Sequence, residues 1–186
     1  NRKIVTINPP VNIDDFDFDA NKEDFYISVG RLEPYKRYDL LIDAFNKNGK
    51  KLIIIGDGSL MESLRQKANS NIEFKGFLFP EKYNDFLKKA KAFIFCGKED
   101  FGIALLEPQV CGTPVIAYGD GGAKDTVLDK KTGIIYNDQT VDSLREAIDL
   151  FEQSVFDYDT IRKHALGFSI DNFKSKFQEN VAEVLA

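Results

Sequence analysis

The sequence is poor in the residues that build metal centres and disulfide frameworks. Its 186 residues include two cysteines, one histidine, one methionine and no tryptophan. Cys96 and Cys111 are single and lie in apolar stretches, so we interpret them as reduced core residues in a reducing compartment. Zinc sites need Cys and His at short, fixed spacings, which this sequence lacks, and we expect no bound metal.

Excess positive charge and long apolar runs are also missing. The formal net charge is -5, which argues against nucleic acid as a partner. No apolar run reaches the roughly 18 to 20 residues of a membrane-spanning helix. No signal peptide opens the chain, although Asn1 is not a natural start. With 43% hydrophobic and 30% charged residues, the composition indicates a soluble globular protein of one domain.

Strands and helices alternate along the chain, joined by short connections. Apolar runs such as FYISVG and KLIIIG are typical of strands buried on both faces. We predict strands at 25–30, 51–56, 71–76, 92–96, 113–118 and 132–136, and helices at 38–47, 59–68, 80–90, 103–112, 140–152 and from 157 to the end. We also predict a short strand at 4–8 and a helix cap at Ser59. This order indicates an α/β fold, a Rossmann-like parallel sheet with helices on both faces.

Ligands of such sheets bind outside the carboxyl ends of the strands. The loop after residue 29 carries three cations, Arg31, Lys36 and Arg37. Arg can hold a phosphate with two hydrogen bonds and Lys adds a point charge, so this loop suits a diphosphate. The alternative is a solvated helix N-terminus, although positive charge is unfavourable at that end of a helix. From the residues alone, both interpretations stay open.

Two glycine-rich loops follow other predicted strands. Residues 56–59 (GDGS) permit a backbone to approach a ligand, or simply turn tightly between a strand and a helix. Residues 119–123 (GDGGA) suit a phosphate or another closely packed ligand, and equally a plain flexible loop. Neither is a GxGxxG fingerprint, so both alternatives remain for each loop.

The loop KEDFG, residues 98–102, leads into a predicted helix whose free amides can bind an anion. Gly102 permits close approach of a ligand. Glu99 and Glu107 have oxygens that can accept hydrogen bonds from sugar or ribose hydroxyls. Glu99 is also explained as a solvated loop acid, whereas Glu107 lies in an otherwise apolar helix. A glycosidase with paired carboxylates is a rival interpretation, but no other residues build a cleft for it.

The single histidine, His164, has no plausible catalytic partner, and we interpret it as a residue of a helix surface. The last segment of the chain places apolar residues on one stripe, which is more often a packing face than a ligand site. This stripe contains Ile170, Phe173, Phe177, Val181 and Val184.

Taken together, these segments resemble glycosyltransferase family four of the GT-B fold over nearly the whole chain. The matching blocks are VGRLEPYKRYDLLIDAF, LIIIGDGSLMESLR, NIEFKGFL, EDFGIALLEPQVCGTPVIAYGDGGAKDTV and TGIIY. The family's most specific mark is a pair of glutamates separated by seven residues, and Glu99 and Glu107 match it. The resemblance implies the C-terminal, donor-binding half of such an enzyme.

The resemblance also implies roles for particular residues. Arg31 and Lys36 would hold the donor diphosphate and stabilise the leaving group, and Glu99 would contact hydroxyls of the transferred sugar. These three are the implied catalytic residues. Glu107 would hold the ribose, the segment after residue 76 would lie beside the base, and amides of residues 102–104 would face the phosphates or sugar. The implied donor-binding residues are Gly30, Phe77, Phe101, Gly102, Ile103, Ala104 and Glu107.

The chain departs from the family's pattern in two ways. Pro108 follows the second glutamate, where the family often has a small residue. Proline is tolerated within a first helical turn, and we expect Pro108 to restrict the backbone of Glu107. The family's acceptor-binding N-terminal domain has no counterpart. We therefore assign 1–20 to an interdomain linker and first strand, 21–168 to the nucleotide-sugar-binding Rossmann-like domain, and 169–186 to a helix that would cross to the missing domain.

The implied activity is that of a retaining hexosyltransferase that needs neither a metal nor another cofactor. The segments PYKR, EDFGI and AYGDGGA are most similar to mannosyltransferases that use GDP-mannose in surface-polysaccharide assembly. The implied partners are a nucleotide-sugar donor and a glycan or lipid-linked acceptor held by the missing domain. The implied location is the cytoplasm, with peripheral association at the inner face of the membrane, and the fragment alone would be inactive. The alternative is a non-catalytic nucleotide-sugar-binding module.

Overall fold

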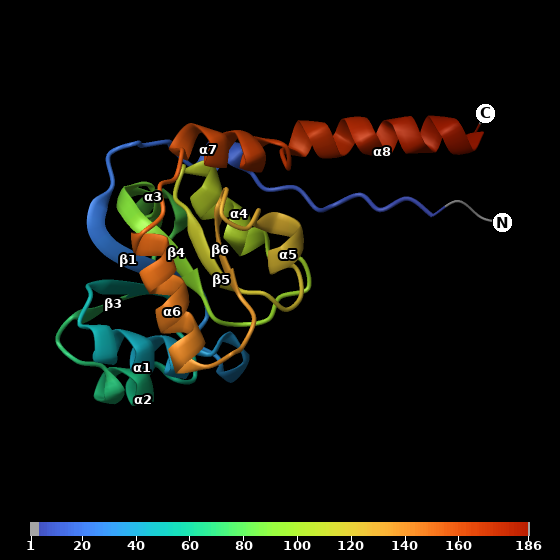
Figure 1. Ribbon diagram of the computed structural model, residues 1–186. Coiled ribbons are helices and arrows are strands. Elements are labelled where there is room, and N and C mark those ends of the chain that lie inside the picture. Colours follow the sequence, from blue (N-terminus) through green and yellow to red (C-terminus); the bar gives the residue numbers. More distant parts are fainter. Residues whose placement is uncertain (1–3, 186) are drawn as a thin grey trace.

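The computed structural model describes residues 4–185, which build a six-stranded sheet between layers of helices (Figure 1). The strands are β1 (Glu23–Val29), β2 (Leu52–Ile55), β3 (Ile72–Gly76), β4 (Ala90–Phe95), β5 (Val115–Tyr118) and β6 (Gly133–Tyr136). They pair in parallel in the order β3-β2-β1-β4-β5-β6. The predicted Rossmann-like α/β fold is confirmed.

Helices cover both faces of this sheet (Figure 1). They are α1 (Tyr38–Asn48), α2 (Met61–Lys67), α3 (Pro80–Lys89), α4 (Ile103–Val110), α5 (Ala123–Thr126), α6 (Val141–Glu152), α7 (Tyr158–Leu166) and α8 (Ile170–Leu185), with 3₁₀ helices η1 (Ile13–Asp15) and η2 (Pro34–Lys36). Strand β2 shows how two cores arise, because its side chains alternate between faces. Ile54 joins a core with residues of α1 and α6, whereas Ile53 and Ile55 join a core with residues of α3 and α4.

The strand order reverses between β1 and β4, which lie side by side in the middle of the sheet. From β1 the chain moves outward to β2 and β3, then returns through α3 to β4 on the other side. The loops that leave the carboxyl ends of β1 and β4 therefore diverge in opposite directions. In open α/β sheets, this divergence creates the crevice in which ligands bind.

The helical stretch predicted from residue 157 to the end is divided into α7 and α8, and α8 corresponds to the helix assigned to 169–186. The linker before β1 interrupts it: the Val11 N–H donates to the Phe168 carbonyl at 2.9 Å. In a continuous helix, the Asn172 N–H would donate to this carbonyl. Here it donates to the Ser169 hydroxyl at 3.3 Å. These bonds replace the helical pattern at residues 167–169, and α8 projects away from the sheet (Figure 1).

The strand predicted at residues 4–8 is wrong, since residues 4–10 carry no strand pairing. A strand needs a neighbour, and this segment runs outside the sheet beside α8 (Figure 1). Val5 and Ile7 line a shallow groove there with Phe177, Val181 and Val184. Phe177 is 52% and Val184 is 85% exposed, so the apolar stripe of α8 is largely uncovered. No helix between residues 4 and 185 is long and apolar enough to span a bilayer.

Candidate functional site

The loops after β1 and β2 stack closely on each other at the carboxyl edge of the sheet. A Cβ at Gly56 would lie 1.9 Å from the Gly30 carbonyl oxygen, and one at Gly58 would lie 2.7 Å from the Leu32 backbone. The Leu32 N–H donates to the Asp57 carbonyl at 3.0 Å. The glycines of residues 56–59 are therefore explained by loop packing. Ser59 was predicted to cap a helix, but its hydroxyl donates to Glu33 Oε2 at 2.7 Å, and α2 begins at Met61.

These loops form one wall of a mainly apolar cavity of about 440 Å³. Its lining consists of Val29, Gly30, Arg31, Ile55, Gly56, Asp57, Phe77, Leu78 and Tyr83. Three residues predicted from the sequence, Gly30, Arg31 and Phe77, thus share one cavity. Phe77 is 63% exposed and meets Phe79 edge-on, with 5.0 Å between ring centroids. A cavity with aromatic and aliphatic walls and one guanidinium suits a flat ring attached to an anion.

Lys36 and Glu99 form an ion pair between the loops after β1 and β4. Their side chains are 14% and 26% exposed. The Lys36 ammonium also lies 5.2 Å from the ring centroids of Tyr35 and Phe95. Two residues predicted to act in catalysis are therefore in direct contact at the reversal of the strand order.

The loop that carries Glu99 is fastened to the second glycine-rich loop. Glu99 and Gly121 form an isolated parallel bridge, and the Gly122 N–H donates to the Glu99 carbonyl at 2.8 Å. A Cβ at Gly122 would lie 2.1 Å from the Phe101 carbonyl oxygen. The glycines of residues 119–123 thus allow two backbones to touch, which decides against a plain flexible loop. The ring of Phe101 is half-buried and lies 6.0 Å from that of Phe168.

Helix α4 begins directly after this loop. Gly102 precedes the helix with φ +89, a left-handed conformation that glycine adopts easily. No side chain caps the helix. Ile103 and Ala104 occupy its first two positions, where the N–H groups have no partner within the helix. Such amides can bind an anion.

Glu107 lies in the second turn of α4, in an apolar environment. The Tyr83 hydroxyl donates to Glu107 Oε2 at 3.3 Å. Burial raises the pKa of Glu107 to about 7, the Tyr83 hydrogen bond acts against this rise, and the charge of Asp15 adds to it. Pro108 is the sixth residue of α4, beyond the first turn in which proline is tolerated, so it removes a hydrogen bond from the helix interior.

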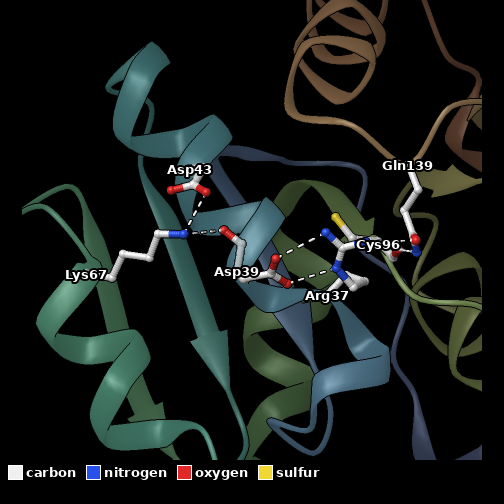
Figure 2. A network of polar contacts seen from close by, with 6 residues as sticks. All are labelled: Arg37, Asp39, Asp43, Lys67, Cys96 and Gln139. Carbon is white, nitrogen blue, oxygen red and sulfur yellow. Dashed lines mark hydrogen bonds and ion pairs between the residues drawn. The ribbon is translucent and has the colours of Figure 1, made fainter.

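Arg37, the third cation after β1, belongs to a structural network (Figure 2). Its guanidinium donates to both Asp39 carboxylate oxygens, at 3.0 and 3.1 Å, and to Gln139 Oε1 at 2.9 Å. The bonds to Asp39 raise the pKa of Arg37. Lys67 extends the network through Asp39 and Asp43, on α1. Arg37 adopts φ +56 immediately before α1, and Asp39 neutralises the charge that the helix N-terminus disfavours.

Sequence reasoning missed Tyr83 as a lining residue of the cavity. The available signal was position: Tyr83 follows β3 closely, and the carboxyl ends of parallel strands share one edge. His164 is half-buried rather than a plain surface residue, and its Nε2 lies 3.1 Å from the Thr126 carbonyl. Within the described part of the chain, no group of three or more His, Cys, Asp or Glu side chains is arranged to hold a metal.

Comparison with known proteins places this site in a family context. Residues 12–165 match the family described as glycosyl transferases group 1. A Corynebacterium glutamicum protein named GDP-mannose-dependent monoacylated alpha-(1-6)-phosphatidylinositol monomannoside mannosyltransferase is 34% identical over 154 residues, covering 74% of this chain and 39% of that protein. A Streptococcus pneumoniae alpha-monoglucosyldiacylglycerol synthase is 28% identical over 121 residues, covering 59% of this chain and 27% of that protein.

Solved structures agree in fold at lower identity. The Anabaena protein HepE, in complex with UDP, has a TM-score of 0.82 at 19% identity, covering 95% of this chain and 57% of that one. A sucrose-phosphate synthase from Thermosynechococcus elongatus has a TM-score of 0.82 at 20% identity, covering 96% and 52%. The chain thus spans less than two thirds of the length of each of these proteins.

Proposed function

The chain belongs to the glycosyl transferases group 1, and from this membership we propose that it is the donor-binding half of a retaining hexosyltransferase. The donor is a nucleoside-diphospho-sugar. The observation that carries this proposal is the ion pair of Lys36 and Glu99 where the strand order reverses, at the same edge of the sheet as the apolar cavity lined by Arg31 and in the loop that leads into α4.

The diphosphate occupies the cationic side of this site. Arg31 binds phosphate oxygens from the cavity wall, and Lys36 adds a second charge. When the bond between sugar and phosphate breaks, negative charge grows on the departing diphosphate, and these fixed cations stabilise it. Amides at Ile103 and Ala104 contribute donors to the same anion.

The two glutamates bind hydroxyl groups on either side of the diphosphate. Glu99 accepts hydrogen bonds from the transferred sugar, and Glu107 accepts them from the ribose. The base lies in the cavity against Phe77. In this arrangement, carboxylates bind hydroxyl groups, cations bind the diphosphate and an aromatic ring contacts the base.

GDP-mannose is the donor that we favour, because the similar proteins from Corynebacterium glutamicum and Mycobacterium tuberculosis are named GDP-mannose-dependent mannosyltransferases. The acceptor is a glycan or a lipid-linked sugar, bound by the part of the longer polypeptide that this chain lacks. That part also covers the apolar stripe of α8, which crosses to it. Association with the cytoplasmic face of a membrane follows from a lipid-linked acceptor.

The test is calorimetric titration of this chain with GDP-mannose, UDP-glucose, GDP and UDP. We expect binding of at least one nucleotide-sugar, and Arg31→Ala should weaken it by about 1.5 to 3 kcal/mol, the worth of a hydrogen bond to a charged group. Arg145→Ala, which removes a partly exposed cation of α6, is the matched control and should bind as the wild type does. Failure to bind any of these ligands would overturn the proposal.

Binding requires no divalent metal in this proposal, because Arg31 and Lys36 supply the positive charge that a metal supplies elsewhere. Titration in the presence of a chelator should give the same affinity as titration with magnesium. Affinity that disappears with the chelator and returns with magnesium or manganese would contradict this part of the proposal.

A further inference from the structure

Tyr83 links the cavity to the half-buried Glu107. It lies in the first turn of α3 and is one of the residues that line the cavity, together with Arg31 and Phe77. Its hydroxyl donates to Glu107 Oε2 at 3.3 Å, and Glu107 itself is not among the lining residues. Tyr83 therefore touches both the space that holds the nucleotide and the carboxylate that the family pattern marks.

Glu107 has few other polar neighbours. Among residues 4–185, Tyr83 is the one side chain that donates a hydrogen bond to it. The titratable groups that face Glu107 are Tyr83 from α3, Asp15 from η1 and, directly after its own helix, Cys111. Arg162, a cation of the packed helix α7, donates to the Val110 carbonyl at 3.0 Å. A carboxylate group rotates as a unit. A hydrogen bond that holds Oε2 of Glu107 therefore also sets the direction in which Oε1 points.

We propose that Tyr83 is a positioning residue for the nucleotide donor: it holds Oε2 of Glu107 so that Oε1 meets the ribose hydroxyls of a nucleoside diphosphate in the adjacent cavity. This inference rests on the proposed function. Burial and the nearby Glu107 raise the pKa of the Tyr83 hydroxyl, so Tyr83 remains protonated and keeps its donor at neutral pH.

The protonation of Glu107 gives this arrangement a measurable signature. Ribose hydroxyls are donors, so they pair best with the ionised carboxylate. Since the pKa of Glu107 lies at about 7, affinity for a ribonucleotide should fall as the pH is lowered from 8 to 6. The Tyr83 hydrogen bond favours the ionised form. Its loss should therefore move the midpoint of this pH profile to higher pH.

The experiment is calorimetry of Tyr83→Phe with GDP and UDP, and with their 2′,3′-dideoxy forms, between pH 6 and pH 8. We expect the variant to bind the ribonucleotides about three- to tenfold more weakly at pH 7, the range for one lost hydrogen bond. Its pH midpoint should rise. The dideoxy forms lack the hydroxyls, so their affinity should be the same for the variant and the wild type.

Tyr26→Phe is the matched control, because the Tyr26 hydroxyl donates to another carboxylate, Glu152, elsewhere in the fold. It should leave affinity and pH profile unchanged. In a Glu107→Gln background, Tyr83→Phe should lose its effect on the pH profile. If the wild type binds ribonucleotides and Tyr83→Phe has the same affinity and midpoint, or weakens the dideoxy forms equally, the inference is overturned and the proposed function stands. If the wild type binds none of them, both fail.

Discussion

Lys36 and Glu99 form an ion pair across the point where the strand order of the sheet reverses. Lys36 belongs to η2, which follows β1, and Glu99 to the loop that follows β4. Both side chains are mostly shielded from water, so their attraction is screened less than that of an exposed pair. A diphosphate at this site therefore competes with Glu99 for the Lys36 ammonium.

From this competition we predict that Glu99→Gln binds free GDP or UDP more tightly than the wild type does. Its gain should be about three- to tenfold, because one charge-assisted contact is released to the diphosphate. Lys36→Ala should bind GDP or UDP about tenfold more weakly, because it removes the ammonium that contacts the diphosphate. Calorimetry measures both.

Asp120→Asn is the control for this prediction, since it weakens the neighbouring pair between Lys98 and Asp120 without touching Lys36. Its affinity should match the wild type. Unchanged affinity in Glu99→Gln would show that the ion pair does not compete with the nucleotide.

A second prediction concerns stability, because burial of Glu107 destabilises the fold at neutral and alkaline pH. The pKa of this carboxyl is about 7 in the folded chain and about 4.3 when unfolded. A raised folded pKa contributes stability below the unfolded value, and that stability is lost as the pH rises through 7. Glu107→Gln should therefore raise the free energy of unfolding by about 3 to 4 kcal/mol at pH 8 and by little at pH 4.

Urea denaturation at the two pH values tests this difference. Glu146→Gln, which replaces an exposed acid of α6, should show no comparable dependence on pH. A stability gain in Glu107→Gln that is the same at pH 4 and pH 8 would contradict the burial argument.

A third prediction follows from the contact between the loops after β4 and β5. Gly122 has φ -65, which alanine also adopts, so Gly122→Ala strains no dihedral angle. Its Cβ would instead lie 2.1 Å from the Phe101 carbonyl. We expect a loss of about 1 to 3 kcal/mol in the free energy of unfolding, measured by thermal denaturation, as in other overpacked sites.

Gly167→Ala provides the comparison, since Gly167 also has negative φ, and its Cβ would meet no atom closer than 3.1 Å. It should cost much less stability than Gly122→Ala. Equal stability of the two variants would show that the loops separate easily.

The strands and most helices could be predicted because local patterns specify them. The run Leu52–Ile55 is apolar on both faces and becomes the buried strand β2. Helix α1 places Leu41, Ala44 and Phe45 on the buried side. Residues 4–8 also had an apolar pattern, yet a strand needs a neighbour, and the sequence does not show which segments lie side by side.

The site was predicted less completely for the same reason. The residue types of Arg31, Lys36 and Glu99 indicated the chemistry. Lys36 and Glu99 lie 63 residues apart in the sequence, however, so their ion pair could not be predicted from a local pattern. Tyr83 carries no local signal for its contact with Glu107. For the two glycine-rich loops, the sequence could not distinguish a ligand-binding loop from a tight turn or a flexible loop. The structure explains their glycines by backbone atoms of other loops, which a Cβ would meet, and the sequence does not show those neighbours.

The last prediction is that this chain binds a nucleotide-sugar but does not transfer the sugar by itself. The chain spans 39% of the Corynebacterium relative and 57% of HepE, and the proposed site holds the donor alone. Fixing an acceptor against the reacting carbon can supply about 7 to 11 kcal/mol of the barrier. Without the remaining polypeptide that contribution is missing, and open water weakens the fields of Arg31 and Lys36.

The assay gives the chain labelled GDP-mannose and then UDP-glucose, each with lipid-linked and free sugar acceptors, while calorimetry reports binding of the same donors. We expect binding without transfer, and transfer only when the missing polypeptide is restored in the same protein. The exposed stripe of α8, with Phe177 at 52% exposure, should then become buried. Robust turnover by residues 1–186 alone would show that they contain the acceptor site, and that the enzyme is divided elsewhere than we propose.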